Sequence, residues 1–426
     1  IQGWNVGEPG FQGAYDYFAE WGETDLADGV RRDRNHPCLF AWSIGNEVDY
    51  PNDPYSHPVL DGKSGFTQAM YGGYKKDAPD AMRLGDIAKR LVKVVKQHDA
   101  SRPVTAGLAG VAMSNETEYP FVLDIAGYNY TENRYDSDHE KYPERIIYGS
   151  ENRHDMDAWK AVRDKPHIFA QFLWTGIDYL GESGVWPSRG FYSGLLDFAG
   201  FIKPRGYFRK SLWSNEPTVY LGTYPVGNNR REQPYLSTDA WPVWNYDDAQ
   251  LIRVVCYTNA RKAQLLLNGE AVGEAKDYDD NTGIIYRDIP FKPGTLSVKG
   301  YDEHNRTVCE YSIRTSKQPA SIALKAYRNE IDKNRGVAQI EVRLLDENGV
   351  PAILADNLLT CSIEGPGKLL GMEAGNNSDM GSYRDNRQRV FMGRMIAYVE
   401  ANGEGDIQVG FSSPWLKTET ITIQAK

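Results

Sequence analysis

The chain has few cysteines, no long apolar run and no excess of basic residues. Its four cysteines, at positions 38, 256, 309 and 361, lack the close spacing of metal ligands. No stretch is apolar enough to cross a bilayer as a helix. Acidic residues outnumber basic ones by 58 to 48, and the net charge of −10 disfavours nucleic acids and anionic lipids as partners, because the field would repel them. A neutral or small substrate fits this charge better.

The few cysteines allow two structural expectations. We expect Cys38 to be a buried thiol because it lies in an apolar segment. A Cys256–Cys309 disulfide is compatible with the sequence, although no pattern requires it. The sequence begins at Ile1 with neither Met nor a signal sequence, so its N-terminus does not indicate the compartment.

Aromatic residues are abundant, with 10 Trp and 27 Tyr in 426 residues. Core packing explains most of them. Flat apolar rings beside polar groups also suit sugar rings and their hydroxyls. The length allows two or three domains.

Helical and strand patterns alternate from residue 14 to about residue 214, which predicts a parallel α/β layer. Residues 82–99 carry apolar side chains at helical spacing. Short apolar runs predict five strands, at residues 39–47, 104–107, 125–130, 146–151 and 168–174.

Beyond residue 217 the apolar residues alternate with period two. Strands are expected at 251–257, 263–267, 294–301 and 308–314, and Asn268-Gly269 is a hairpin signal. A second set is expected at 322–327, 337–345, 358–363, 394–400, 407–411 and 418–423. The predicted fold is therefore α/β plus all-β. Its predicted domains are a barrel region (1–216), an immunoglobulin-like sandwich (217–317) and a second sandwich (318–426).

Two glutamates stand where predicted strands end, Glu47 and Glu151. In a parallel barrel, residues at the carboxyl tips of the strands face the active site. A single glutamate after a strand is more often a salt-bridge or helix-start residue. Two at matching positions, with Asn46, Tyr130 and Trp174 at strand tips beside them, favour the carboxylate pair of a retaining glycosidase, whose carboxyl groups are about 5–5.5 Å apart.

The motifs around these residues resemble glycoside hydrolase family 2. Arg-Asp-Arg-Asn-His-Pro at 32–37, followed by Trp-Ser-Ile-Gly-Asn-Glu at 42–47, resembles its acid/base signature. Residues 147–151 resemble its nucleophile strand and 127–130 the strand before it. Residues 170–182 resemble the last barrel strand of the β-galactosidase-like branch, and the two sandwiches resemble accessory domains.

This resemblance implies a role for each residue. Glu47 would be the general acid/base, Glu151 the nucleophile, and Asn46 a hydrogen-bond partner of the sugar 2-hydroxyl. Tyr130 would donate to Glu151, and Trp174 would stack against the sugar ring. The loop after the last strand adds Asp178 and Trp186 as further candidate substrate contacts. The mechanism requires no metal or cofactor.

The resemblance begins after the third strand of the (β/α)8 barrel, so the first barrel strands and the preceding domains are expected outside this chain. An open half barrel would leave apolar edges in water. We therefore expect either the missing N-terminal part of the same enzyme or self-association to cover them.

The implied activity is a retaining exo-β-glycosidase acting on oligo- or polysaccharides, with β-galactosidase as the leading hypothesis. A β-glucuronidase or β-mannosidase is the alternative, although no Asn has Lys two residues later, the pair with which uronate-cleaving relatives recognise the carboxylate. A noncatalytic carbohydrate-binding or scaffold fragment is the third reading. The family and substrate class imply a periplasmic or secreted protein.

Overall fold

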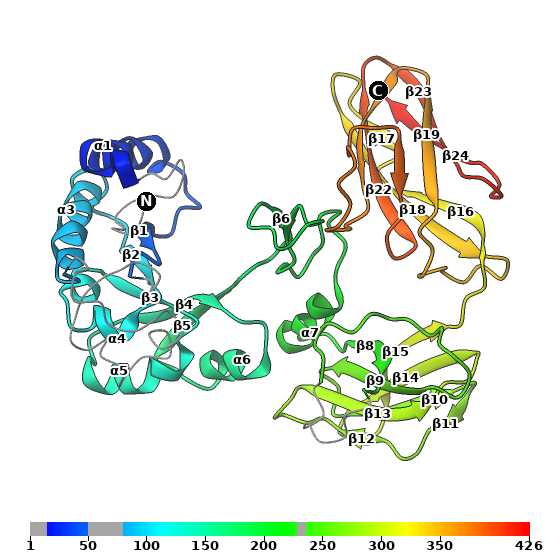
Figure 1. The fold of residues 1–426 in the computed structure, drawn as a ribbon, viewed down its shortest axis with the longest axis horizontal. Coiled ribbons are helices and arrows are strands. Elements are labelled where there is room, and N and C mark those ends of the chain that lie inside the picture. The colour runs from blue at the N-terminus through cyan, green and yellow to red at the C-terminus, as the bar shows by residue number, and fades with distance from the viewer. Residues whose placement is uncertain (1–14, 50–79, 228–235) are drawn as a thin grey trace. The chain divides into compact units, whose positions relative to one another are not determined.

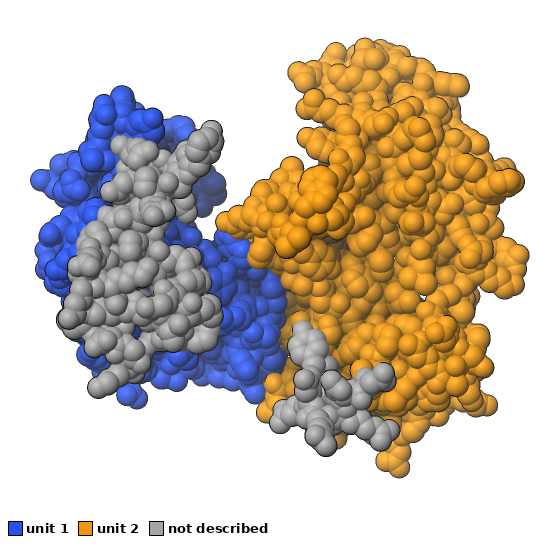
Figure 2. Space-filling view, in the orientation of Figure 1, with its two compact units in different colours: residues 1–174 blue, residues 175–426 orange. Residues whose placement is uncertain are grey.

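A computed structural model describes residues 15–49, 80–227 and 236–426. The chain divides into two compact units, unit 1 (residues 1–174) and unit 2 (residues 175–426) (Figure 2). Each unit contains apolar core clusters of its own. Among the described helices, none is long and apolar enough to cross a membrane.

Unit 1 is built on a five-stranded sheet with the order β1-β2-β3-β4-β5 (Figure 1). All neighbouring strands are parallel. Their carboxyl ends therefore meet at one edge of the sheet. The five strands predicted from the sequence are confirmed, with these bounds: β1 (Trp42–Asn46), β2 (Val104–Leu108), β3 (Ile125–Asn129), β4 (Ile147–Asn152) and β5 (Ile168–Leu173).

Helices connect and flank these strands. The predicted helix at 82–99 is confirmed as α3 (Arg83–His98), and its apolar stripe, including Leu84 and Leu91, is buried. Burying such side chains contributes about 1.5–3 kcal/mol each. The stripe shares a core cluster with Ile44 of β1 and Val30 of α1, so it anchors the helix layer to the sheet. The other helical segments among the described residues of unit 1 are α1 (Tyr15–Asp33), α4 (Val111–Ser114), η2 (Tyr119–Phe121), η3 (Glu132–Arg134), α5 (Tyr135–Lys141) and α6 (Met156–Arg163).

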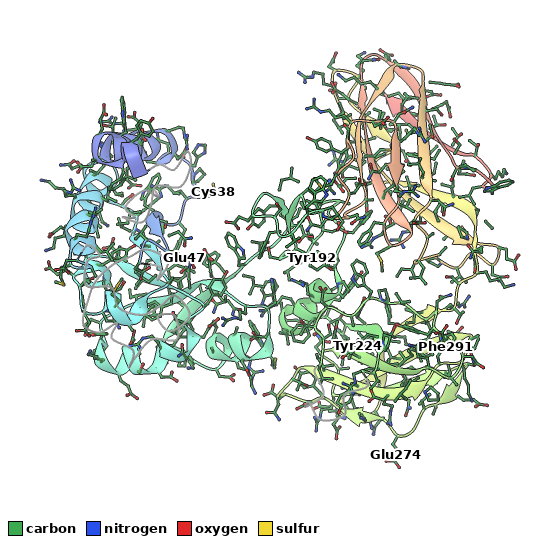
Figure 3. The ribbon with its side chains drawn as sticks, viewed as in Figure 1. Cys38, Glu47, Tyr192, Tyr224, Glu274 and Phe291 are labelled. Atoms are coloured by element: carbon green, nitrogen blue, oxygen red, sulfur yellow. The ribbon has the colours of Figure 1, made fainter. Side chains whose placement is uncertain are left out.

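The expectation for Cys38 was wrong. Its side chain is exposed, and the strand begins only at Trp42 (Figure 3). The turn that includes the His36–Leu39 hydrogen bond keeps residues 36–39 out of the sheet. Although Cys38 has apolar neighbours in the sequence, its thiol does not belong to the core.

Unit 2 begins with irregular chain and a single longer helix. It contains the short strands β6 (Tyr179–Leu180) and β7 (Gly190–Phe191), which pair with each other, and α7 (Pro204–Trp213). Pro204 occupies the first turn of α7, where a missing N–H costs no helical hydrogen bond.

Two β-sandwiches follow α7. In the first, the sheet β13-β9-β8 packs against a sheet containing β11-β10-β14-β15, with β12 paired to β10. Asn268 and Gly269 connect β10 and β11 with positive φ angles of 54° and 86°, which confirms the predicted hairpin. The bounds are β8 (Val219–Pro225), β9 (Leu251–Thr258), β10 (Lys262–Leu267), β11 (Glu270–Ala271), β12 (Lys276–Asp277), β13 (Ile284–Pro290), β14 (Thr295–Tyr301) and β15 (Thr307–Arg314).

The second sandwich packs the sheet β16-β18-β22-β20 against β17-β24-β23-β19-β21. The predicted succession of a parallel α/β layer and β-sandwiches is thus confirmed. The bounds are β16 (Pro319–Ala326), β17 (Glu330–Ile331), β18 (Val337–Asp346), β19 (Leu358–Glu364), β20 (Gly367–Glu373), β21 (Arg387–Arg389), β22 (Arg394–Ala401), β23 (Gly405–Ser412) and β24 (Glu419–Ala425).

The predicted domain boundaries stay predictions. Compactness divides the chain after Trp174, inside the predicted barrel region of residues 1–216, and places both sandwiches in one unit. The disulfide considered between Cys256 and Cys309 is not formed, and both are free thiols.

Candidate active site

Five of the predicted site residues lie at strand tips of unit 1, namely Asn46, Glu47, Tyr130, Glu151 and Trp174. The amide of Glu47 donates to the carbonyl of Gly107 at 2.8 Å, just beyond the end of β1. The amide of Tyr130 donates to the carbonyl of Glu151 at 2.8 Å, which joins the ends of β3 and β4. Trp174 extends the same edge, because its amide donates to the carbonyl of Asn152 at 3.2 Å. Figure 3 marks Glu47 at the sheet.

Glu47 and Tyr130 share an uncommon backbone conformation. Their φ angles are 51° and 54°, in the left-handed region that residues other than glycine rarely adopt. Such strain persists only where the surrounding structure enforces it, and it gathers at functional sites. Here it turns the chain sharply at the tips of β1 and β3.

Tyr130 lies within the electrostatic reach of both candidate carboxylates. Burial raises the pKa of its hydroxyl, and the charge of Glu151, a hydrogen bond to Glu151 and the charge of Glu47 raise that pKa further. The hydroxyl therefore keeps its proton and can donate it in a hydrogen bond to Glu151. Arg153, whose guanidinium carbon lies 5.6 Å from the Tyr130 ring centroid, opposes this effect with its positive charge.

Asn129 joins Asn46 to Glu47 and was not singled out from the sequence. Its Nδ2 donates to Oδ1 of Asn46 at 3.0 Å and to Oε1 of Glu47 at 3.2 Å. Its Oδ1 accepts a hydrogen bond of 2.5 Å from Ser150 Oγ of β4. The side chain is 1% exposed and so is held in place. The available signal was a polar residue at the tip of β3, one position before Tyr130.

Gly107 of β2 makes room for this network. A Cβ atom at Gly107 would lie 2.5 Å from Oδ1 of Asn46 and 3.0 Å from Oδ1 of Asn129. Any larger side chain would therefore push the two amides apart. The site depends on this absence of a side chain in β2.

Trp174 is half-buried at the end of β5. Its carbonyl lies 2.9 Å from Nε2 of His154, a residue of the segment after β4. Together with the amide bond to Asn152, this contact fixes the backbone that carries the indole ring.

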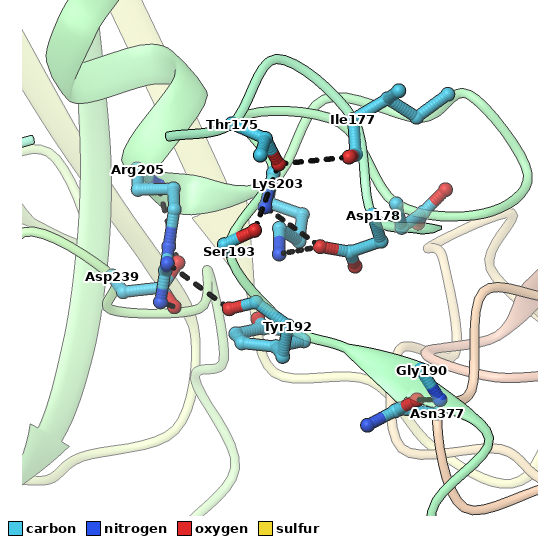
Figure 4. A network of polar contacts seen from close by, with 12 residues as sticks. Thr175, Ile177, Asp178, Gly190, Tyr192, Ser193, Lys203, Arg205, Asp239 and Asn377 are labelled. Atoms are coloured by element: carbon cyan, nitrogen blue, oxygen red, sulfur yellow. Dashed lines mark hydrogen bonds and ion pairs between the residues drawn. The ribbon is translucent and has the colours of Figure 1, made fainter. Parts of the chain in front are cut away.

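Asp178 and Trp186, the remaining predicted contacts, belong to unit 2. Oδ1 of Asp178 accepts hydrogen bonds from Lys203 Nζ at 2.7 Å and from the amide of Gly194 at 2.8 Å (Figure 4). The side chains of Asp178 and Lys203 are both 0% exposed, so this ion pair is internal to unit 2. Trp186 is 73% exposed. Contacts of either residue with substrate stay predictions.

The arrangement in unit 1 suits proton transfer and nucleophilic attack. Glu151 has a tyrosine hydroxyl as hydrogen-bond donor, whereas Glu47 accepts a hydrogen bond from a neutral side-chain amide. Two carboxyl groups in unlike environments can divide the roles of acid and nucleophile. Within the described residues, no group of three or more His, Cys, Asp or Glu could hold a metal ion.

Comparison with known families supports the reading of the motifs. Residues 24–182 match the TIM barrel domain of glycosyl hydrolases family 2, and residues 322–422 match the C-terminal domain 5 of glycoside hydrolase family 2. Residues 249–309 match a domain of unknown function.

Individual relatives extend over nearly the whole chain. A β-galactosidase of Bacteroides ovatus is 29% identical over 96% of this chain and 52% of its own length. A protein of Formosa agariphila named a putative β-glucuronidase is 25% identical over 94% of this chain and 40% of its own length. The chain thus spans about half the length, or less, of these curated relatives.

A solved structure shows the same arrangement of elements. A glycosyl hydrolase family 2 member from Bacteroides cellulosilyticus superposes with a TM-score of 0.83 and 27% identity, covering 98% of this chain and 53% of that one. Barrel and C-terminal matches, an alignment over nearly the entire chain and a shared fold agree, and the protein belongs to glycoside hydrolase family 2.

Proposed function

We propose that this protein takes part in retaining hydrolysis of β-glycosides, with Glu151 as nucleophile and Glu47 as general acid/base. The observation that carries the proposal is the position of Tyr130, whose hydroxyl bonds to Glu151 and experiences the charge of Glu47 as well. Both carboxylates therefore act on one small region at the carboxyl edge of the sheet.

The first step cleaves the bond between the sugar and its leaving group. A carboxylate oxygen of Glu151 attacks the anomeric carbon and forms an ester, while protonated Glu47 transfers its proton to the departing glycosidic oxygen. In the second step Glu47, now ionised, takes a proton from water, and the resulting oxygen nucleophile breaks the ester. Two inversions at the same carbon retain the β configuration.

The neighbours of the carboxylates support these steps. The hydroxyl of Tyr130 would donate a hydrogen bond to Glu151 and orient it, which leaves its other carboxylate oxygen for attack. Asn46, held through Asn129, would bind the sugar 2-hydroxyl, an interaction that strengthens in the transition state. Trp174 would lie against the apolar face of the ring.

For the terminal sugar we propose a β-galactoside. The curated β-galactosidase of Bacteroides ovatus supports this choice, as does the absence of an Asn-x-Lys pair in the sequence. A β-glucuronide is the second candidate, favoured by the relative from Formosa agariphila. Because oligo- and polysaccharides are the proposed substrates, we also propose that the protein is periplasmic or secreted.

Matched substrates and covalent trapping test the activity. Hydrolysis of 4-nitrophenyl β-galactoside, β-glucuronide and β-mannoside would rank the three sugars. A 2-fluoro-β-galactoside with a good leaving group should label Glu151, as found by peptide mass spectrometry, with the 2-fluoro-glucuronide in parallel. A folded sample that none of these reagents labels would favour a noncatalytic carbohydrate-binding or scaffold protein.

Two variants separate the proposed roles. Glu151→Gln should abolish turnover of every substrate. Glu47→Gln should lower kcat by about 10²–10⁴-fold for a methyl glycoside, whose leaving group needs protonation, and much less for a 2,4-dinitrophenyl glycoside. Glu140→Gln, an exposed carboxylate of α5, is the matched control. Equal losses in Glu47→Gln on both substrates would contradict the assignment of the acid.

We also propose that the sheet of unit 1 is covered in the complete enzyme by further residues of the same protein. Three phenylalanines of this unit, Phe40, Phe169 and Phe172, are 64%, 47% and 55% exposed, although rings of this size are usually buried. The curated relatives are about twice as long as this chain. Association of two copies is the alternative cover.

A further inference from the structure

Unit 2 contains a cavity that none of the proposed catalytic residues lines. Its volume is about 390 Å³, within the range of sites for small molecules. The lining comes from α7, β8, the end of β15, and the second sandwich at β18 and the turn before β22. Both sandwiches and the helix thus contribute to the cavity. Ligand sites commonly lie between packed elements in this way.

One wall of the cavity is aromatic and rigid. The rings of Tyr207 and Tyr220 stack at 4.5 Å between centroids and 12° between planes. Tyr220 is 2% exposed, and its hydroxyl donates to the carbonyl of Ala240 at 3.1 Å, so the stack is fixed from behind. Trp241 also lines the cavity and is only partly buried. Tyr207 and Trp241, which are both partly buried, can offer flat apolar surface to the C–H groups of a sugar ring, and Tyr220 supports Tyr207 from behind.

The charges that line the cavity have one sign. Three arginines contribute to it, Arg314, Arg343 and Arg394, and none of the described lining residues is Asp or Glu. This contrasts with a chain whose net charge is −10. Burial lowers the pKa of Arg394 and the charge of Arg343 lowers it further, whereas the charges of Asp197 and Glu341 oppose the shift.

The three guanidinium groups differ in how many contacts they already make within the protein. Arg394 packs over the Phe201 ring at 4.3 Å and lies 3.7 Å from Oδ2 of Asp197, so it is structurally engaged. Arg343 pairs with Glu341 and keeps 48% of its side chain exposed. Arg314 is exposed and forms no ion pair within the described part of the chain. Arg314 and Arg343 are therefore the groups with donors left for a ligand.

We propose that this cavity binds an acidic saccharide, a sugar ring that carries a carboxylate or a sulfate group. The planar guanidinium group matches the oxygens of either anion with two parallel hydrogen bonds. The ring would pack on the aromatic wall while Arg314 and Arg343 hold the anionic group. The site belongs to unit 2, whereas the proposed catalytic carboxylates belong to unit 1, so the proposal does not depend on the proposed hydrolysis.

Binding by the full chain tests the proposal, with Glu151→Gln as the background so that no probe is consumed. Methyl β-glucuronide, glucose 6-sulfate and uncharged methyl β-glucoside are compared by isothermal titration calorimetry. We expect at least one charged sugar to bind about tenfold or more tightly than methyl β-glucoside, and its affinity to fall as NaCl is raised. The preferred charged sugar distinguishes a uronate from a sulfated ligand.

The arginine variants locate the binding. Arg314→Gln combined with Arg343→Gln should weaken the affinity for the charged sugar about tenfold or more. Arg306→Gln changes an exposed arginine of the first sandwich and should leave this affinity unchanged. Asn46→Ala in unit 1 should likewise leave it unchanged. Thermal unfolding verifies that each variant is folded.

Three results would overturn the proposal. The first is equal affinity for charged and uncharged sugars. The second is a charged sugar whose binding survives in the double arginine variant, or disappears in Asn46→Ala. The third is inorganic sulfate binding as tightly as glucose 6-sulfate, which would mean an anion site without recognition of the sugar.

Discussion

Asn129 is the residue whose single side chain connects most of the proposed machinery. Its amide nitrogen contacts both Asn46 and Glu47, and its oxygen accepts from Ser150. A rotation of this one side chain would release both Glu47, the proposed general acid, and Asn46, the proposed sugar-binding amide. It is thus a positioning residue rather than a group that reacts.

Asn129→Ala is predicted to reduce activity while the protein stays folded. Hydrogen bonds to charged groups contribute about 1.5–3 kcal/mol, so kcat/KM should fall by about 10–150-fold. The pH profile of kcat/KM should also shift, because Glu47 loses the hydrogen bond from the side-chain amide of Asn129. A residue with a purely structural role would not change this profile. Kinetics with an aryl glycoside measure both effects, and Asn133→Ala, an exposed asparagine of η3, is the control. Equal behaviour of the two variants would contradict the role given to Asn129.

Asp197 offers a test of electrostatics in unit 2. Burial raises its pKa to about 6 from an ordinary value of 3.8, although Arg394 and the amides of Phe201 and Ala199 oppose the shift. Its Oδ1 accepts those two amide bonds at 2.9 Å, and the residue is 1% exposed. Between these two pKa values the folded protein holds a proton that the unfolded chain has lost.

The free energy of unfolding should therefore fall as the pH rises through this window. The contribution of protonated Asp197 is complete below the unfolded pKa and is lost above about 6. Asp197→Asn resembles the protonated form, so its stability relative to the parent should rise by about 3 kcal/mol between about pH 4 and pH 7. Urea unfolding at several pH values measures the difference, and exposed Asp385→Asn serves as control. A pH-independent difference would show that Asp197 is ionised throughout.

At the scale of elements, Asp49 ties β1 to the segment that follows β2. It is 1% exposed and accepts bonds from the amides of Ala109 and Gly110, both at 3.0 Å, and from Ser114 Oγ at 2.6 Å. Because Asp49 stands two residues after Glu47, this anchor holds the turn at the tip of β1.

Asp49→Ala should destabilise unit 1 by about 3 kcal/mol or more, since it leaves buried donors without an acceptor. Activity should fall with it because the turn that carries Glu47 loosens. Asp49→Asn keeps one acceptor oxygen and should lose less on both counts, and Ser114→Ala removes a single donor. Unfolding curves and kinetics of the three variants provide the comparison; a milder effect in the alanine variant than in Asp49→Asn would be contrary to expectation.

Strands and turns with a simple local pattern were predictable from the sequence. The five parallel strands and the hairpin at Asn268-Gly269 are at the expected positions. β13 was missed because Arg287 and Asp288 interrupt its apolar pattern. In the sheet Asp288 lies opposite Arg253 and forms an ion pair with it at 2.8 Å. A cross-strand partner 35 residues away thus stabilises a residue that strands otherwise disfavour.

At the scale of the whole molecule, the exposed aromatic residues of unit 1 carry a prediction about association. Phe169 and Phe172 of β5 are exposed, and Phe40, which precedes β1, lies 6.4 Å from Phe169 between ring centroids. Exposed rings gathered in this way favour contact with another apolar surface.

We expect the isolated chain to associate as its concentration rises, and Phe169→Ser combined with Phe172→Ser to reduce that association. Sedimentation velocity over a range of concentrations measures it. Tyr383→Ser, which removes an exposed aromatic ring of unit 2, is the matched control and should leave association unchanged. A parent chain that is monomeric at every concentration would mean that the phenylalanines are covered within the chain.

Local sequence patterns were sufficient to assign the class of most segments and to identify the candidate carboxylates. Strand periodicity, turn residues and a carboxylate at a strand end are local patterns, set by residues close together along the chain. They were sufficient to bring Glu47, Tyr130 and Glu151 into one prediction, and the parallel sheet then placed their backbones at one edge.

Contacts between side chains that are distant in sequence became visible only in the folded chain. The bridge from Asn129 to Glu47 spans 82 residues, and the cavity with its arginines draws on both sandwiches and α7. The internal pairing of Asp178 with Lys203 and the exposure of Cys38 depend likewise on packing. The physical reason is that burial and charge pairing are set by neighbours in space, which local sequence patterns do not specify.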